Sequence, residues 1–79
     1  MAMTDKEKEW ADKVRRFLKA ELKRAELSYK DLADKLTAHG MEETEVGITS
    51  KLARGTFSAT FLLACLAVLG LSGIDLEDL

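Results

Sequence analysis

The 79-residue chain contains no proline, one cysteine, one histidine and few aromatic residues. A single cysteine, Cys65, excludes both an internal disulfide and a C-x-x-C zinc motif. The longest mostly apolar run, 57–71, is too short and too interrupted for a membrane span. Met1 is followed by charged residues instead of a long apolar stretch, so a signal peptide is not expected. These absences favour a soluble cytoplasmic protein that has no membrane partner.

The lack of proline, together with β-branched residues that never alternate along the chain, predicts an all-α protein. The apolar fraction of 47% is normal for a globular protein and excludes wholesale disorder. Residues 1–79 are enough for a single domain with a small core.

Basic residues are scarce outside one segment of the chain. The net charge of −2 argues mildly against nucleic-acid binding, since nucleic-acid-binding domains usually carry a basic excess. However, residues 13–35 carry eight basic and four acidic side chains, whereas residues 36–79 carry two basic and six acidic side chains. The positive charge is therefore concentrated in residues 13–35, and the net charge of the whole chain does not show this concentration.

Hydrophobic spacing and capping motifs predict five helices. The first begins at Asp5 and ends near Glu26, with an apolar stripe on which Trp10 is expected to be a core anchor. Serine and threonine residues before the other four can accept hydrogen bonds from free N–H groups of a first helical turn. The expected helices are 5–26, 29–39, 45–54, 59–69 and 73–79, and the N-caps of the last four are Ser28, Thr44, Ser58 and Ser72.

Glycines mark most of the helix ends. Gly40, Gly55 and Gly70 are expected in the left-handed conformation, with the residue after Gly70 placed for a Schellman contact. The helix 59–69 is apolar on nearly every face and is expected to be central and buried. Gly47 lies inside the helix 45–54, where glycine costs about 1 kcal/mol relative to alanine. Either another group approaches the backbone there, or the glycine is simply tolerated.

Several segments, taken in order, resemble lambda-repressor-like (Cro/repressor-type) helix-turn-helix domains over about residues 14–79. "LSYKDLADKL" is similar to their second helix, "ITSKLARG" to the end of their recognition helix, and "FSATFLLACLAVLGLSGIDLEDL" to their fourth and fifth helices. The resemblance implies a compact five-helix helix-turn-helix fold, here with a lengthened turn between helices 2 and 3. The chain also resembles a bacterial domain family of unknown function with a similar Glu-Glu-Thr-Glu segment, which implies no activity.

The first resemblance implies a transcriptional regulator that binds double-stranded DNA. A recognition helix reads base edges with its first turns, and the expected base contacts are Glu45, Val46, Thr49 and Ser50. Basic side chains and residues near helix starts are expected to hold phosphates, namely Ser28, Lys30, Lys51, Arg54, Thr56 and Ser58. Glu42, Glu43 and Glu45 should oppose phosphate binding.

In lambda-repressor-like proteins the fifth helix commonly forms a dimer contact, so the resemblance implies a homodimer. The expected interface residues are Leu71, Ile74, Leu76 and Leu79; the alternative is that these residues cover one end of the core. The alternative function is a protein–protein interaction module that keeps the fold without binding DNA. The acids near the start of the third helix fit that alternative, because they favour the positive end of a helix dipole whatever the helix binds.

No enzyme is expected, and no catalytic, metal, cofactor or small-molecule site. His39 is expected to interact with the end of the second helix. Cys65 lies on the apolar helix, where we expect its thiol to pack among apolar side chains and burial to raise its pKa. The carboxylates have no histidine or cysteine neighbours at metal-ligand spacing.

Overall fold

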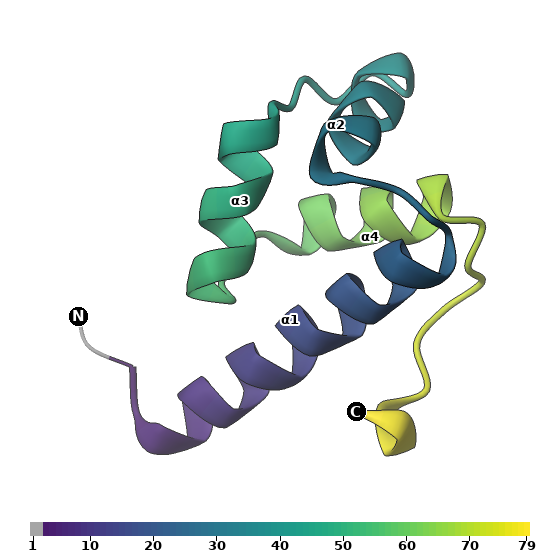
Figure 1. The fold of residues 1–79 in the computed structure, drawn as a ribbon. Coiled ribbons are helices and arrows are strands. Elements are labelled where there is room, and N and C mark those ends of the chain that lie inside the picture. Colours follow the sequence, from purple (N-terminus) through teal and green to yellow (C-terminus); the bar gives the residue numbers. More distant parts are fainter. Residues whose placement is uncertain (1–2) are drawn as a thin grey trace.

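The computed structural model describes residues 3–79, which form four α-helices, a short 3-10 turn and no strand. Helix α1 crosses one side of the molecule, α3 and α4 lie beside it, and α2 lies farther away on the other side of α4 (Figure 1). The molecule measures 35 × 27 × 19 Å. The elements are α1 (Asp5–Arg24), α2 (Tyr29–Ala38), α3 (Glu45–Arg54), α4 (Ala59–Val68) and the 3-10 turn η1 (Leu76–Asp78).

Helices α2, α3 and α4 begin at the caps that the sequence predicts, whereas the Thr4 cap of α1 was not predicted. Ser28 accepts a hydrogen bond from the backbone N–H of Asp31, whose carboxylate accepts in turn from the Ser28 N–H. This reciprocal pair lowers the pKa of Asp31, first through the backbone bond and then through the serine hydroxyl. Thr44 caps α3 and Ser58 caps α4 by the same kind of side-chain bond.

The glycines predicted at helix ends have positive φ angles: Gly40, 92°; Gly55, 70°; and Gly70, 74°. At the end of α4, the N–H of Leu71 donates to the carbonyl of Leu66 at 2.9 Å, which completes the predicted Schellman motif. Backbone N–H groups after α2 and α4 therefore satisfy carbonyls in the last turns of those two helices.

The core is one cluster to which α1, α2, α3 and α4 all contribute. Helix α2 packs against both α3 and α4, and α1 packs against α3. The buried cluster consists of Leu18, Leu22, Leu32, Ala33, Leu36, Ile48, Leu52, Phe61 and Cys65.

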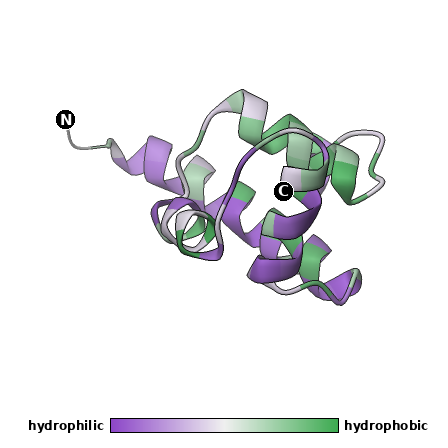
Figure 2. Cartoon of the chain, turned by 90° about the horizontal axis from the view of Figure 1, so that it is seen from above, coloured by the Kyte–Doolittle hydropathy of each residue, from purple (hydrophilic) through white to green (hydrophobic). Residues whose placement is uncertain are grey.

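Two packing predictions are wrong. Trp10 is 55% exposed instead of anchoring the core, because the first turns of α1 extend beyond the other helices (Figure 1). The Nζ atom of Lys13 lies 4.6 Å from the centre of the Trp10 ring. Helix α4 is hydrophobic along almost its whole length (Figure 2), yet it is not buried all round, since Leu63 is 64% exposed.

Within residues 3–79, no single helix is long and apolar enough to cross a membrane. Helices α3 and α4 reach the required length and composition only as a pair, and the pair is bent by 117°.

The predicted fifth α-helix, 73–79, is replaced by an extended segment and the η1 turn. Ser72 caps no helix; instead, the Asp75 carboxylate accepts from the N–H of Glu77 and caps η1. A helix this short cannot offset its own nucleation, and a local aspartate bond offers the backbone an alternative. Gly73 adds to the cost, because glycine loses the most conformational freedom on ordering.

Helix α1 ends at Arg24, two residues before the predicted position. The strained residue lies just after it, in the turn that terminates the helix. Glu26 has a φ of 57°, and the N–H of Leu27 donates to the carbonyl of Leu22 at 2.9 Å. This is a Schellman motif with glutamate where glycine is usual. The left-handed conformation costs a residue with a Cβ atom roughly 1–2 kcal/mol.

We therefore expect Glu26→Gly to stabilise the domain by about 1 kcal/mol, raising the melting temperature by about 4–8 °C. Ala25→Gly is the matched control, because Ala25 has a right-handed φ of −81° and glycine there should destabilise. Thermal unfolding followed by circular dichroism measures both. A Glu26→Gly variant that melts at or below the wild-type temperature would contradict the assignment of strain.

The packing of α4 is tested by two leucines on the same helix. Leu66 is buried and Leu63 is exposed. Leu66→Ala should lower the free energy of unfolding by about 2–5 kcal/mol, whereas Leu63→Ala should change it by about 0.5 kcal/mol or less. Urea denaturation measures both, and equal losses would show that the buried face of α4 is assigned wrongly.

Candidate nucleic-acid interface

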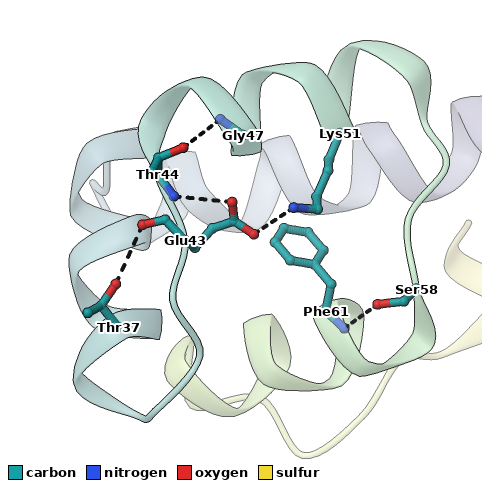
Figure 3. A network of polar contacts seen from close by, with 7 residues as sticks. All are labelled: Thr37, Glu43, Thr44, Gly47, Lys51, Ser58 and Phe61. Carbon is teal, nitrogen blue, oxygen red and sulfur yellow. Dashed lines mark hydrogen bonds and ion pairs between the residues drawn. The ribbon is translucent and has the colours of Figure 1, made fainter.

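The turn between α2 and α3 is held in place by Glu43 (Figure 3). The Lys51 Nζ atom donates to Glu43 Oε2 at 2.7 Å, and the N–H of Thr44 donates to Glu43 Oε1 at 3.1 Å. The Thr37 hydroxyl donates to the Glu43 carbonyl at 3.5 Å. The side chain of Glu43 is only 9% exposed, so its charge points into the protein and not toward solvent.

Gly47 is explained by the same carboxylate. A Cβ atom on Gly47 would lie 2.3 Å from Glu43 Oε1 and 3.1 Å from the Thr44 hydroxyl oxygen. Of the two explanations that the sequence left open, the close approach of another group is the right one. Glu43 and Gly47 therefore form one unit, in which the missing side chain makes room for the carboxylate.

Lys51 is also held from its other side. Its Nζ atom lies 5.1 Å from the centre of the Phe61 ring on α4, and its side chain is 29% exposed. An ammonium group over an aromatic face is attracted by the ring quadrupole. Lys51 thus links the α2–α3 turn, α3 and α4. Its charge is largely compensated before any phosphate could reach it.

The outer face of α3 is exposed, and the predicted base contacts lie together on it. Val46 is 79% exposed, and Glu45, Thr49 and Ser50 are exposed beside it. The Thr49 hydroxyl donates to the Glu45 carbonyl at 2.9 Å, which leaves its methyl group as the outward feature. The Ser50 hydroxyl makes no hydrogen bond within residues 3–79.

The predicted phosphate contacts fall into two groups. Arg54, Thr56 and Ser58 follow one another from the end of α3 to the start of α4, and all are exposed. Ser28 and Lys30 lie at the start of α2; the Lys30 Nζ atom is 3.4 Å from an Asp34 carboxylate oxygen, in a pair open to solvent. No hydrogen bond or ion pair of the described chain joins the two groups.

The far end of α3 is fastened to α1 by contacts that the sequence did not reveal. The Arg15 guanidinium donates to the Ala53 carbonyl at 3.1 Å and pairs with Asp12. A Cβ atom on Gly55 would lie 2.8 Å from the Ala11 carbonyl oxygen, so the end of α3 touches the α1 backbone. Arg15 and Ala53 are far apart in the chain, and no local pattern signals their contact.

The reactive side chains have structural roles. Cys65 is buried, and its thiol pKa is raised to about 12, mainly by burial, with a smaller rise from nearby Glu43 and a smaller opposing effect of Lys51. The Nδ1 atom of His39 lies 3.0 Å from the Lys35 carbonyl at the end of α2. Residues 3–79 contain no group of three or more His, Cys, Asp or Glu side chains arranged to hold a metal ion.

These features define a small all-helical domain in which α3 is fastened at both ends and along its inner face. A family model described as a domain of unknown function, DUF6471, matches residues 10–74, and the chain belongs to that family. No curated protein and no solved structure matches the chain.

The Glu43–Gly47 unit predicts that one substitution has opposite effects in two backgrounds. In the wild type, Gly47→Ala displaces the carboxylate from charge-assisted bonds worth about 1.5–3 kcal/mol, which exceeds the gain of about 1 kcal/mol from alanine in a helix. We therefore expect Gly47→Ala to destabilise the wild type. In a Glu43→Ala background, the same substitution should stabilise the domain by about 1 kcal/mol. Urea denaturation of the four proteins measures the coupling.

Ser50→Ala in both backgrounds is the control, because Ser50 is exposed on α3 and its substitution should give the same small change in each. The short contact of Gly47 with Thr44 is common to both backgrounds and cancels in the coupling energy. Equal effects of Gly47→Ala with and without the Glu43 carboxylate would contradict the unit.

Proposed function

We propose that this domain is a DNA-binding transcriptional regulator of the Cro/repressor type, with α3 as its recognition helix. The observation that carries the proposal is the combination of a fully exposed outer face on α3 with rigid attachment of the rest of that helix. The attachments are the Glu43–Lys51 pair at its start and the Arg15–Ala53 bond at its end. Reading base edges requires a helix that protrudes but does not move.

The charge distribution is compatible with this proposal. Because Glu43 is paired with Lys51, it opposes phosphate less than its formal charge suggests. No acidic residue occurs in 46–74, which includes the end of α3 and all of α4. Arg54 is exposed and forms no ion pair within residues 3–79. Phosphates would contact Arg54, Thr56 and the N–H groups at the start of α4.

The proposed reading set is small and partly apolar. The Val46 methyl groups and the Thr49 methyl suit the methyl group of thymine. Ser50 can donate to or accept from several bases, and Glu45 can accept from the amino group of cytosine. Such a surface would distinguish few base pairs per domain, which makes a second copy useful.

A homodimer is therefore part of the proposal, since two copies of α3 could contact successive major grooves. Of the residues expected at the interface, Leu76 is 68% exposed, whereas Leu71, Ile74 and Leu79 are partly buried. Without a fifth α-helix, Leu76 is the residue best placed for a contact. Sedimentation of the intact chain at high micromolar concentration tests self-association, and a Leu76→Asp variant tests the contact.

The second candidate function is a protein–protein interaction module. It is favoured by the large exposed apolar side chains, of which Val46 lies on α3 itself. A valine surrounded by short polar residues can pack against a protein as well as against a groove. The two candidates differ in the measurement that follows.

We expect DNA recovered from a genomic pull-down to bind with a salt dependence that reports phosphate contacts. Arg54→Ala should weaken binding to all sequences alike and flatten the plot of log affinity against log salt by about one unit. Ser50→Ala should instead change the preference at one base position. Lys6→Ala is the control, because Lys6 is exposed on the first turn of α1. Fluorescence anisotropy over a salt series measures all three.

Glu45→Gln gives the complementary test, since Glu45 is exposed at the start of α3 and its neutralisation should strengthen binding. Glu43→Gln is unsuitable, because it would break the pair with Lys51. If Arg54→Ala and Glu45→Gln both leave affinity and salt dependence unchanged, α3 does not lie at the DNA, and the interaction module becomes the better proposal.

A further inference from the structure

The segment after α4 is held to the rest of the molecule only by apolar contact. No hydrogen bond or ion pair joins residues 72–79, here called the tail, to any other part of the described chain. Ile74 and Leu79 are partly buried, whereas Leu76 is mostly exposed. The tail turns back from the end of α4 toward α1 (Figure 1). It is therefore a weakly attached cover.

Two hollows lie between the tail and α1, and Leu79 lines both of them. The first has a volume of about 560 Å³ and mainly apolar walls, which include Trp10, Val14, Phe57 and Leu62. The second has a volume of about 480 Å³. It is lined on α1 by Lys13, Arg16, Phe17, Ala20, Glu21 and Arg24 and on the tail by Asp75, Asp78 and Leu79. The two hollows share Leu79 of the tail, and we call them together the α1 groove; the first is mainly apolar, and α1 gives the second three basic side chains and one acid.

The tail complements this groove in charge but does not fill it. It carries three acids and no basic residue, and Asp75 and Asp78 share the second hollow with the α1 cations. No ion pair forms across the hollow; Arg24 pairs instead with Glu21 on its own helix at 2.5 Å. Attraction between opposite charges is present, but direct contact is not made.

We propose that the α1 groove is a docking site for an acidic, leucine-containing segment of a partner protein. The tail, Ser-Gly-Ile-Asp-Leu-Glu-Asp-Leu, is its weakly held occupant within the same chain. Leucine side chains of the partner enter the apolar end beside Trp10, and its carboxylates meet Lys13 and Arg16. The site is separate from α3, and the proposal stands whether or not the domain binds DNA.

The probe is a synthetic peptide of residues 72–79, acetylated, amidated and labelled, added to the full chain. Trp10 is the only tryptophan and lines the groove, so its emission reports occupancy alongside peptide anisotropy. An Ile74→Ser, Leu79→Ser chain has a loosened tail and should bind the peptide about fivefold more tightly than the wild type, because the groove is open more of the time. Circular dichroism should show unchanged helix content, since neither residue belongs to the core cluster.

Charge variants of the chain and of the peptide distinguish specific docking from non-specific binding. Lys13→Glu, Arg16→Glu in the loosened chain should weaken peptide binding by about tenfold at low salt. Lys19→Glu, Lys23→Glu, on the same helix but outside the groove lining, should leave it nearly unchanged. A peptide with Asp75→Asn, Glu77→Gln and Asp78→Asn should bind the loosened chain about tenfold more weakly than the acidic peptide.

Three results would overturn the proposal. One is no binding of the acidic peptide to the loosened chain at millimolar concentration. Another is equal binding of the acidic and neutralised peptides. The third is tail exchange between copies, seen as a wild-type dimer that the peptide dissociates, which would assign the groove to a second copy of this chain.

Discussion

The ion pair between Glu43 and Lys51 is the interaction on which the geometry of α3 depends. It lies where the α2–α3 turn, α3 and α4 meet, and it has the Thr44 cap on one side and the Phe61 ring on the other. A partly buried pair of this kind is more important for fixing an arrangement than for net stability, since desolvation offsets much of the attraction. Here the ion pair fixes the start of α3. The Glu43 carboxylate can take this position because residue 47 is glycine and has no side chain in its way.

The local structure was predictable because its determinants are local. The caps Ser28, Thr44 and Ser58 and the glycines after α2, α3 and α4 specify the helix bounds through bonds between residues three to five positions apart. Such bonds are visible in a sequence as spacing alone. The bounds of α3 follow from them directly.

The features that the sequence did not reveal depend on tertiary distance. The exposure of Trp10 follows from how far α1 extends beyond its neighbours, and the Arg15–Ala53 bond joins residues 38 positions apart. Glu43 looked like a surface acid because nothing in the chain identifies Lys51, eight residues later, as its partner. The fifth helix was wrong for a different reason: Ser72 caps no helix, because a local bond to the Asp75 carboxylate offers the backbone an alternative.

The Glu43–Lys51 ion pair changes how the uneven distribution of charge along the chain should be understood. With Glu43 and Lys51 compensating each other, the basic residues concentrated in 13–35 lie mainly on α1 and α2, and the acidic tail lies across one edge of α1. A polyanion approaching α1 would meet the field of the tail as well as that of Lys13 and Arg16, so non-specific attraction there is partly screened. Affinity for DNA would then depend on the short polar face of α3 and on Arg54 beside it. If the domain binds DNA as proposed, its general affinity for nucleic acid should be small, and most of its discrimination should come from the few residues that α3 exposes.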